Sequence, residues 1–291
     1  MLEVLDQDEV AIFGIVAINV PRATIAARVR DVSGFLRRPT RAGFGIFSTP
    51  ATAADARSFS AEQSDLDALK KCRPGDCDVK MPVARFDEFG QSIDWSAADA
   101  SSRVNAAVRQ TMADYVERYR KGGTASMVAY GDQKSVRSSS DAFASLLTES
   151  PYIYDYVPAF QRYLQGYPRD TLAGVTDAIY WATDHLASLR PILSVTHLSV
   201  YEPTGAPLTL VSEKQLYASH YFLGAFTLTT LLDRPDAPGG SGSYYMVVQR
   251  MRFDHLPSGG LLNIRGRVVG KMSDALAAEL RDRKASLEAG R

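Results

Sequence analysis

Residues 243–253 read SYYMVVQRMRF, and residues 260–289 read GLLNIRGRVVGKMSDALAAELRDRKASLEA. The first stretch is rich in aromatic and β-branched residues, which predicts a strand. The second stretch has the spacing of one long helix, with apolar residues near one face at Val269, Met272, Leu276, Leu280 and Leu287. A strand followed by such a helix at the end of the chain predicts a curved antiparallel sheet wrapped on a long C-terminal helix.

More strands precede this block. Ile192–Glu202 (ILSVTHLSVYE) predicts one strand, and Leu208–Leu232 is the longest extended stretch. At about 3.3 Å per residue the second stretch is too long for one straight strand. We therefore expect Gly224 to mark a bend, a bulge or a break. The turn at 203–207 and the Gly-rich loop at 233–243 predict antiparallel connections.

The N-terminal part begins with another strand, Glu9–Val20 (EVAIFGIVAINV), which ends before Pro21. Residues 22–38 have helical spacing, and Gly34 is expected to divide them into two short helices. Residues 43–48 predict a short second strand. Further on, we expect a short helix capped by Ser64 and a strand at 78–81.

The stretch 99–190 is predicted to be a mostly helical insertion that packs on the sheet within a single domain, 1–291. Its clearest helix covers residues 99–120, and others are expected around 124–131, 139–147 and 155–165. Residues 151–167 (PYIYDYVPAFQRYLQGY) are rich in tyrosine, which offers a flat ring with a polar tip. Helix-to-sheet packing is the favoured interpretation of these rings, and the cover of an apolar pocket is the other.

The composition is that of an ordinary globular chain. Of 291 residues 45% are hydrophobic, and 33 basic side chains balance 33 acidic ones. Without a net charge, nothing in the composition argues for nucleic acid or an anionic membrane as a partner. The start of the chain is not a signal peptide, since it is acidic, and the apolar run at 11–20 is too short to span a bilayer.

Cys72 and Cys77 enclose the sequence Arg-Pro-Gly-Asp, and a turn there can bring them within disulfide range. A bond is expected in an oxidising compartment and two free thiols in cytosol. A disulfide is the favoured interpretation, which in turn favours a periplasmic or exported protein whose leader is absent, with a cytoplasmic protein as the alternative. No second Cys pair or His pair indicates zinc.

The order of elements is a strand, two short helices, a run of antiparallel strands and one long C-terminal helix. This resembles the helix-grip fold of the START-like superfamily of proteins that bind lipids and other hydrophobic ligands. The resemblance is carried by EVAIFGIVAINV with the helix after it, and by the closing strand and helix quoted above. It implies an apolar cavity between the sheet and the C-terminal helix. A fold of this kind serves carriers, receptors and enzymes alike.

Candidate ligand-binding residues lie on the predicted strands. His220 is expected in the middle of the long strand, where it could bind a polar head or act as a general base, although a satisfied core histidine is commoner. His197 is similar. Strict alternation places Leu216, Ala218, His220 and Phe222 on one face, which we take as the inward one; a bulge would swap the faces locally. The remaining candidates are Tyr217, Tyr221, Tyr245 and Met246.

The leading hypothesis is a non-enzymatic carrier or binder of a lipid, sterol-like or other apolar molecule, with possible transient membrane contact. One alternative is an enzyme of cyclase or hydrolase type that uses His220 or His197 as a base. Another is a protein-interaction module that uses the Tyr-rich helices. No catalytic residue or cofactor is predicted, since motifs such as G-x-S-x-G, H-E-x-x-H and G-x-G-x-x-G are absent from the sequence.

Overall fold

The computed structural model describes residues 4, 6–86, 93–185, 189–256 and 264–290. Its centre is a seven-stranded antiparallel sheet in the order β1-β9-β8-β7-β6-β5-β2. The strands are β1 (Glu9–Ile18), β2 (Arg41–Ile46), β5 (Val175–Asp184), β6 (Ile192–Tyr201), β7 (Leu208–Ala218), β8 (Phe222–Asp233) and β9 (Ser243–Phe253). A separate two-stranded ribbon joins β3 (Ala129–Tyr130) to β4 (Arg137–Ser138).

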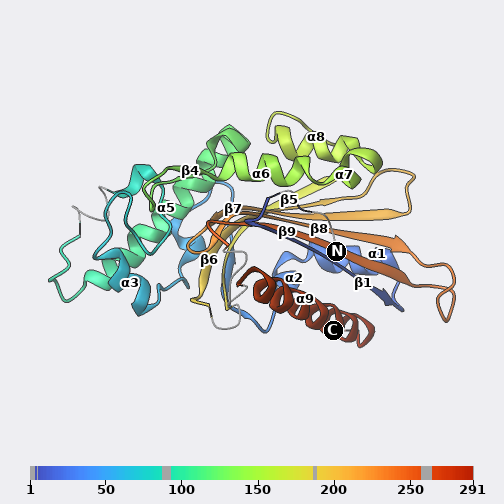
Figure 1. Cartoon of the computed structure of the whole chain (residues 1–291). Helices are drawn as coiled ribbons and strands as arrows, with labels where there is room; N and C mark the ends of the chain where they lie inside the picture. The colour runs from blue at the N-terminus through green and yellow to red at the C-terminus, as the bar shows by residue number, and fades with distance from the viewer. Residues whose placement is uncertain (1–3, 5, 87–92, 186–188, 257–263, 291) are drawn as a thin grey trace.

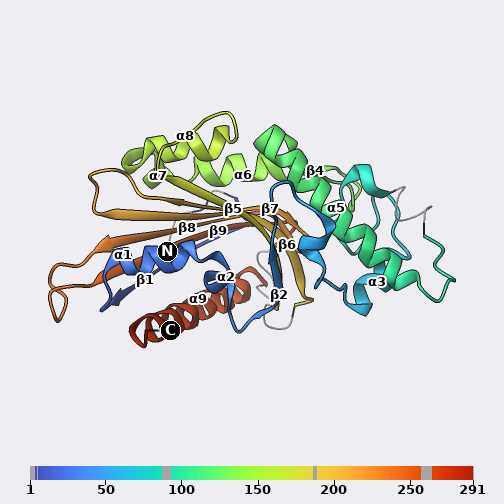
Figure 2. The ribbon, with the colours of Figure 1, turned by 180° about the vertical axis from the view of Figure 1, so that it is seen from behind.

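Helices cover both faces of the sheet (Figure 1). The described α-helices are α1 (Arg22–Arg30), α2 (Val32–Leu36), α3 (Gln63–Leu69), α5 (Ala100–Gly122), α6 (Ser139–Thr148), α7 (Pro151–Tyr156), α8 (Pro158–Gly166) and α9 (Ile264–Glu288). The described 3₁₀ turns are η1 (Ala53–Ala56), η2 (Val83–Arg85) and η3 (Gly123–Ser126). Figures 1 and 2 show α6, α7 and α8 on one face, α1, α2 and α9 on the other, and α3 and α5 at one end.

The long helix α9 packs closely on β1. A Cβ atom added to Gly14 would lie 2.6 Å from Leu280 Cδ1 and 3.1 Å from Leu276 Cδ2. The apolar core on this face joins Leu276 and Leu280 to Val10 and Ile12 of the strand. The predicted C-terminal helix is confirmed from Ile264 onward, and its expected start at 260–263 lies outside the described residues.

The core on the opposite face is formed by α5, α6 and α8 with the other side of the same strands. Tyr119, Phe143 and Phe160 pack there against Trp181 and Phe226. The prediction that residues 99–165 form helices that pack on the sheet is confirmed for α5, α6 and α8. Most of the Tyr-rich stretch follows the packing interpretation, because Tyr163 is buried while Tyr152 and Tyr167 are half-buried against this core; Tyr156 is 81% exposed.

Several elements differ from the prediction. Residues 175–184 form β5, a full strand within the stretch that was expected to be mostly helical. Residues 78–81 are not a strand but an irregular segment, and residues 124–131 form η3 and β3 in place of a helix. The break between α1 and α2 falls at Asp31, whose side chain caps α2 by accepting from Gly34 N, and not at Gly34 itself.

The long stretch 208–232 is indeed two strands, but its break lies at 219–221. Tyr221 has φ of 63°, a left-handed conformation in the turn directly before β8. Gly224 follows as the site of a bulge in β8, as predicted, and a Cβ there would lie 3.2 Å from Ala142 Cβ of α6. The expectation that His220 lies in mid-strand is therefore wrong: it lies in the turn between β7 and β8.

Candidate functional site

A partly enclosed apolar pocket lies where α3, α5 and the segment 79–82 meet the ends of strands β5, β6 and β7. Its volume is about 90 Å³. Much of its wall is aliphatic, including Leu69, Val79, Met81, Val108, Met112 and Leu193. We call it the α5 pocket. It lies on the face of the sheet that packs α5 and α6, not on the face that packs α9, because its lining residues Met112, Leu193 and Val195 belong to the α5-side core.

One side of the α5 pocket is a single stripe of helix α5. The side chains of this stripe are spaced three and four residues apart, which places them on one helix face. They are Val108, Thr111, Met112, Tyr115 and Arg118. The Tyr115 hydroxyl donates to the carbonyl oxygen of Leu216 at 2.7 Å, which fixes the helix on β7. Burial raises the pKa of Tyr115, so its hydroxyl stays a donor.

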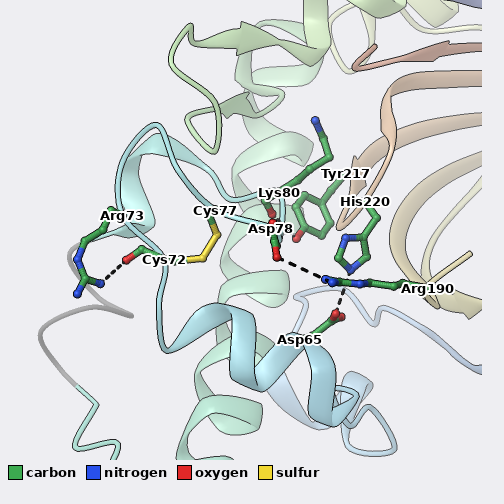
Figure 3. Close-up of a disulfide and its surroundings, with 9 residues drawn as sticks. All are labelled: Asp65, Cys72, Arg73, Cys77, Asp78, Lys80, Arg190, Tyr217 and His220. Atoms are coloured by element: carbon green, nitrogen blue, oxygen red, sulfur yellow. Dashed lines mark hydrogen bonds and ion pairs between the residues drawn. A yellow bond between two sulfur atoms is a disulfide. The ribbon is translucent and has the colours of Figure 1, made fainter. Parts of the chain in front are cut away.

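The other wall is fixed by a disulfide between Cys72 and Cys77, whose Cα atoms lie 4.5 Å apart (Figure 3). Pocket residues lie on both sides of this bond in sequence: Leu69 before it and Val79 after it. The segment after the bond is tied to the sheet, because Lys80 N donates to Ser219 O at 2.8 Å. The disulfide therefore joins α3 to the segment 79–82 as two parts of one wall.

Tyr217 is the predicted ligand-binding residue that reaches the α5 pocket. It lines the wall, and its hydroxyl donates to the carbonyl oxygen of Lys80 at 2.8 Å. The Lys80 amine points away from the disulfide in Figure 3 and forms an ion pair with Asp254. Asp78 lies near Arg190, with 3.9 Å between Oδ2 and Nη2.

His220 lies beside this wall with a carboxylate partner. Its Nε2 lies 3.1 Å from Asp65 Oδ1, and Asp65 lines the α5 pocket (Figure 3). The His220 side chain is buried, so its ring is not in bulk solvent. A histidine oriented by a carboxylate has the arrangement of a general base.

Thr111 provides an unpaired polar atom in the same pocket. Its Oγ1 is buried and has no hydrogen-bond partner among the described residues. A buried hydroxyl without a partner is costly, and it can bond with a ligand that brings a polar group.

A second buried polar cluster surrounds His197, under α5 and α8. His197 Nδ1 lies 2.9 Å from the Tyr119 hydroxyl, and His197 Nε2 lies 2.9 Å from Asp177 Oδ1. Asp177 also accepts from Tyr163 at 2.5 Å and from Ser199 at 2.7 Å. Burial lowers the pKa of His197, although Asp177 opposes this, so the ring is held neutral within a satisfied network.

Lys214 lies in the same cluster and was missed by the sequence analysis. Its Nζ donates to Thr124 Oγ1 at 2.7 Å and lies 4.0 Å from the centre of the Phe143 ring. Burial lowers its pKa to about 7. Within the described part of the chain, no carboxylate lies within 4.0 Å of this amine.

The space between the sheet and α9 holds other candidates. Phe222 and Tyr245 belong to the apolar core on this face. A charged group also lies there: Arg38 is 3.4 Å from Glu213 of β7 and 3.2 Å from Glu279 of α9. Burial raises the pKa of Glu213, but Arg38 and the Tyr180 hydroxyl outweigh this and lower it overall. The apolar cavity expected between the sheet and α9 stays a prediction.

The remaining predicted residues do not converge on one site. Leu216 faces the α5 side, whereas Phe222 faces the α9 side. The prediction that strict alternation places both side chains on one inward face is therefore wrong. A one-residue bulge in β7 opposite Val195 and Thr196 causes the change. Tyr221 packs half-buried against the α9-side core, and Met246 is half-buried on β9.

The helices within the described ranges include none with the length and apolarity needed to cross a membrane. Across the same residues, no group of three or more His, Cys, Asp or Glu side chains is placed to hold a metal ion. Comparison of the chain with protein-family models, with curated proteins and with solved structures found no match.

Proposed function

We propose that this protein binds a small apolar molecule in the α5 pocket. The observation that carries the proposal is a partly enclosed, mainly aliphatic space with a buried hydroxyl in its wall, Thr111 Oγ1, which has no hydrogen-bond partner among the residues that the structure describes. Ligand sites are commonly concave and apolar with a few polar groups that fix orientation. Removing an alkyl chain from water into such a space contributes roughly 25 cal/mol per Å² of buried apolar surface.

The volume narrows the class of ligand. At about 90 Å³ the α5 pocket is far smaller than the roughly 300–1,000 Å³ of pockets that enclose a drug-sized molecule. The small volume favours a single alkyl or acyl chain over a sterol-like or polycyclic molecule. Part of such a chain continues along the mouth of the pocket.

We also keep the helix-grip interpretation as a proposal. The order β1, α1, α2, β2, five further strands of the sheet and α9 supports it. In this interpretation the segments between β2 and β5 are an addition, and the α5 pocket belongs to the addition and not to the space under α9.

Titration calorimetry with 1-octanol tests the proposed function. The wild-type protein is expected to bind with a negative heat-capacity change, the mark of apolar burial. Val108→Trp places a large ring in the pocket and should abolish binding. Val136→Trp is the matched control, because Val136 is 63% exposed and does not line the pocket. Binding that survives Val108→Trp, in a variant whose circular dichroism matches the wild type, rules the pocket out.

A hydrolase is the second candidate, favoured by the 3.1 Å contact between His220 Nε2 and the pocket carboxylate Asp65. His220 would take a proton from a water molecule that attacks the carbonyl carbon of an ester bound by its acyl chain. It would return this proton to the alcohol oxygen as the ester C–O bond breaks, which leaves a carboxylic acid and a free alcohol. Turnover of 4-nitrophenyl butyrate that is lost in His220→Gln, while 1-octanol still binds, would support catalysis. Equal turnover by both proteins, or none by the wild type, would count against it.

A further inference from the structure

The charged residues of the α5 pocket are arranged with opposite signs at its two ends. Among the described residues, five charged side chains line it: Glu62, Asp65, Lys80, Arg85 and Arg118. Three of these have a side-chain partner, since Lys80 pairs with Asp254, Arg85 pairs with Asp114, and Asp65 contacts the His220 ring. Within the described residues, Glu62 and Arg118 have no ion-pair partner within 4.0 Å.

Helix α5 shows where these two charges lie. Ala61 N donates to Asn105 Oδ1 at 2.7 Å, so Glu62, the next residue, lies beside the early part of α5. Arg85 lies 3.4 Å from Asp114, and Arg118 lies one turn further along. From Asn105 to Arg118 the helix rises about 20 Å at 1.5 Å per residue. The α5 pocket thus has an acidic end near Glu62 and a basic end near Arg118.

The stripe between the two ends is mainly apolar. The acidic end is separated from Arg118 by the side chains of Val108, Thr111, Met112 and Tyr115. The Arg118 guanidinium lies over the Tyr115 ring, 5.4 Å from its centre, and its side chain is exposed to solvent. Arginine in this setting offers several N–H donors in a planar fork that suits a carboxylate or phosphate.

We infer that the ligand of the α5 pocket is a single-chain amphipathic anion, with its alkyl chain in the pocket and its anionic head at Arg118. This inference rests on the proposed function. Glu62 repels an anion at the opposite end, so the charge pattern selects one orientation of the ligand as well as the sign of its head. The head is a carboxylate or a phosphate, which share this chemistry.

Calorimetry with octanoate, octyl phosphate and 1-octanol, three ligands with the same chain, tests the inference on the full-length protein. Octanoate is expected to bind about fivefold more tightly than 1-octanol, the ratio that an exposed ion pair of about 1 kcal/mol gives. High salt should reduce this preference. If octanoate binds more tightly than octyl phosphate, the natural head group is a carboxylate; if octyl phosphate binds more tightly, it is a phosphate. Either result supports the inference.

Two variants separate the inference from the proposed function. Arg118→Gln should remove the preference for octanoate over 1-octanol, whereas Glu62→Gln should keep the preference or increase it. Equal wild-type affinities for octanoate and 1-octanol, or equal weakening of both ligands by Arg118→Gln, overturns the anionic head while the apolar pocket stands. If none of the three ligands binds, the proposed function fails, and the inference fails with it.

Discussion

His197 and Lys214 face each other across strands β6 and β7, as direct partners in the antiparallel register, and both side chains are buried. The two differ in their partners. His197 has Tyr119 and Asp177, but the Lys214 amine meets a hydroxyl, a carbonyl and aromatic rings. Burial of an amine without a carboxylate favours its neutral form, because charge in a low-dielectric site is costly.

Lys214→Met is expected to stabilise the protein by about 1–4 kcal/mol at neutral pH, since an apolar side chain of similar length replaces a buried amine. Burial lowers the pKa of Lys214 from 10.5 to about 7. The unfolded state therefore binds more protons between these values, and wild-type stability should rise with pH across that window. Urea unfolding at several pH values measures both effects.

Lys271→Met is the control for Lys214→Met, because Lys271 is exposed on α9. It should leave both the stability and its pH dependence close to those of the wild type. A Lys214→Met protein that unfolds at lower urea than the wild type would show that the amine stabilises the fold through its contacts with Thr124 and the rings.

The elements that the sequence predicted well are those with a strong local pattern. Four elements with a continuous apolar face or run lie within a few residues of their expected bounds: β1, β9, α5 and α9. The strand β5 was missed because VTDAIYWATD follows a long helical stretch and has no clear alternation. Its place in the sheet depends on pairing with β2 and β6, which are distant in sequence.

The candidate site was predicted less well, for a related reason. The β7 bulge at Leu216, after which Ala218 faces the α9 side, is stabilised by the Tyr115 hydroxyl, 101 residues away. The α5 pocket joins α3, α5 and three strand ends, and no local pattern shows that these meet. The spacing of Val108, Met112 and Tyr115 was visible as a helix face, but a pocket-facing stripe looks like a core-facing one.

Glu9 provides a second pH-dependent prediction. Its carboxylate is buried, with Oε1 bonded to Arg250 at 2.7 Å and Oε2 without a hydrogen-bond partner in the described part of the chain. Burial raises the pKa of Glu9 from 4.5 to about 7, although Arg250 opposes this. The native state then binds more protons than the unfolded state between these values, so this group makes stability fall as pH rises through that window.

Glu9→Gln should remove that fall in stability, because glutamine keeps the shape and does not titrate. Urea unfolding across the same pH range measures the slope, and Glu62→Gln, at an exposed residue, is the control. An unchanged slope in Glu9→Gln would assign the pH dependence to other groups. Arg250→Met should destabilise by about 3–5 kcal/mol, since it leaves Glu9 and Glu149 without their shared cation.

The disulfide is expected to stabilise the protein by about 2 kcal/mol, since it closes a loop with a sequence separation of five residues. A double variant, Cys72→Ser with Cys77→Ser, should unfold at correspondingly lower urea. It should also bind 1-octanol more weakly, because α3 and the segment 79–82 are no longer joined. Dithiothreitol should produce the same two effects in the wild type and none in the double variant. Mass spectrometry can show whether the wild-type disulfide is reduced. If it is reduced and the stability of the protein is unchanged, the predicted stabilisation by the disulfide is wrong.

Gly14 and Gly270 form a matched pair that tests the packing of α9 on β1. Gly14→Ala should destabilise by about 1–3 kcal/mol, because its Cβ would lie 2.6 Å from Leu280 Cδ1 in a packed core. Gly270→Ala lies within α9 and has nothing within 4 Å of the added Cβ, so it should stabilise by about 1 kcal/mol through helix propensity. Urea unfolding compares both with the wild type. If Gly14→Ala is neutral while Leu280→Ala on its own is strongly destabilising, then Leu280 moves aside at little cost. If both variants are neutral, α9 does not pack on β1 as described.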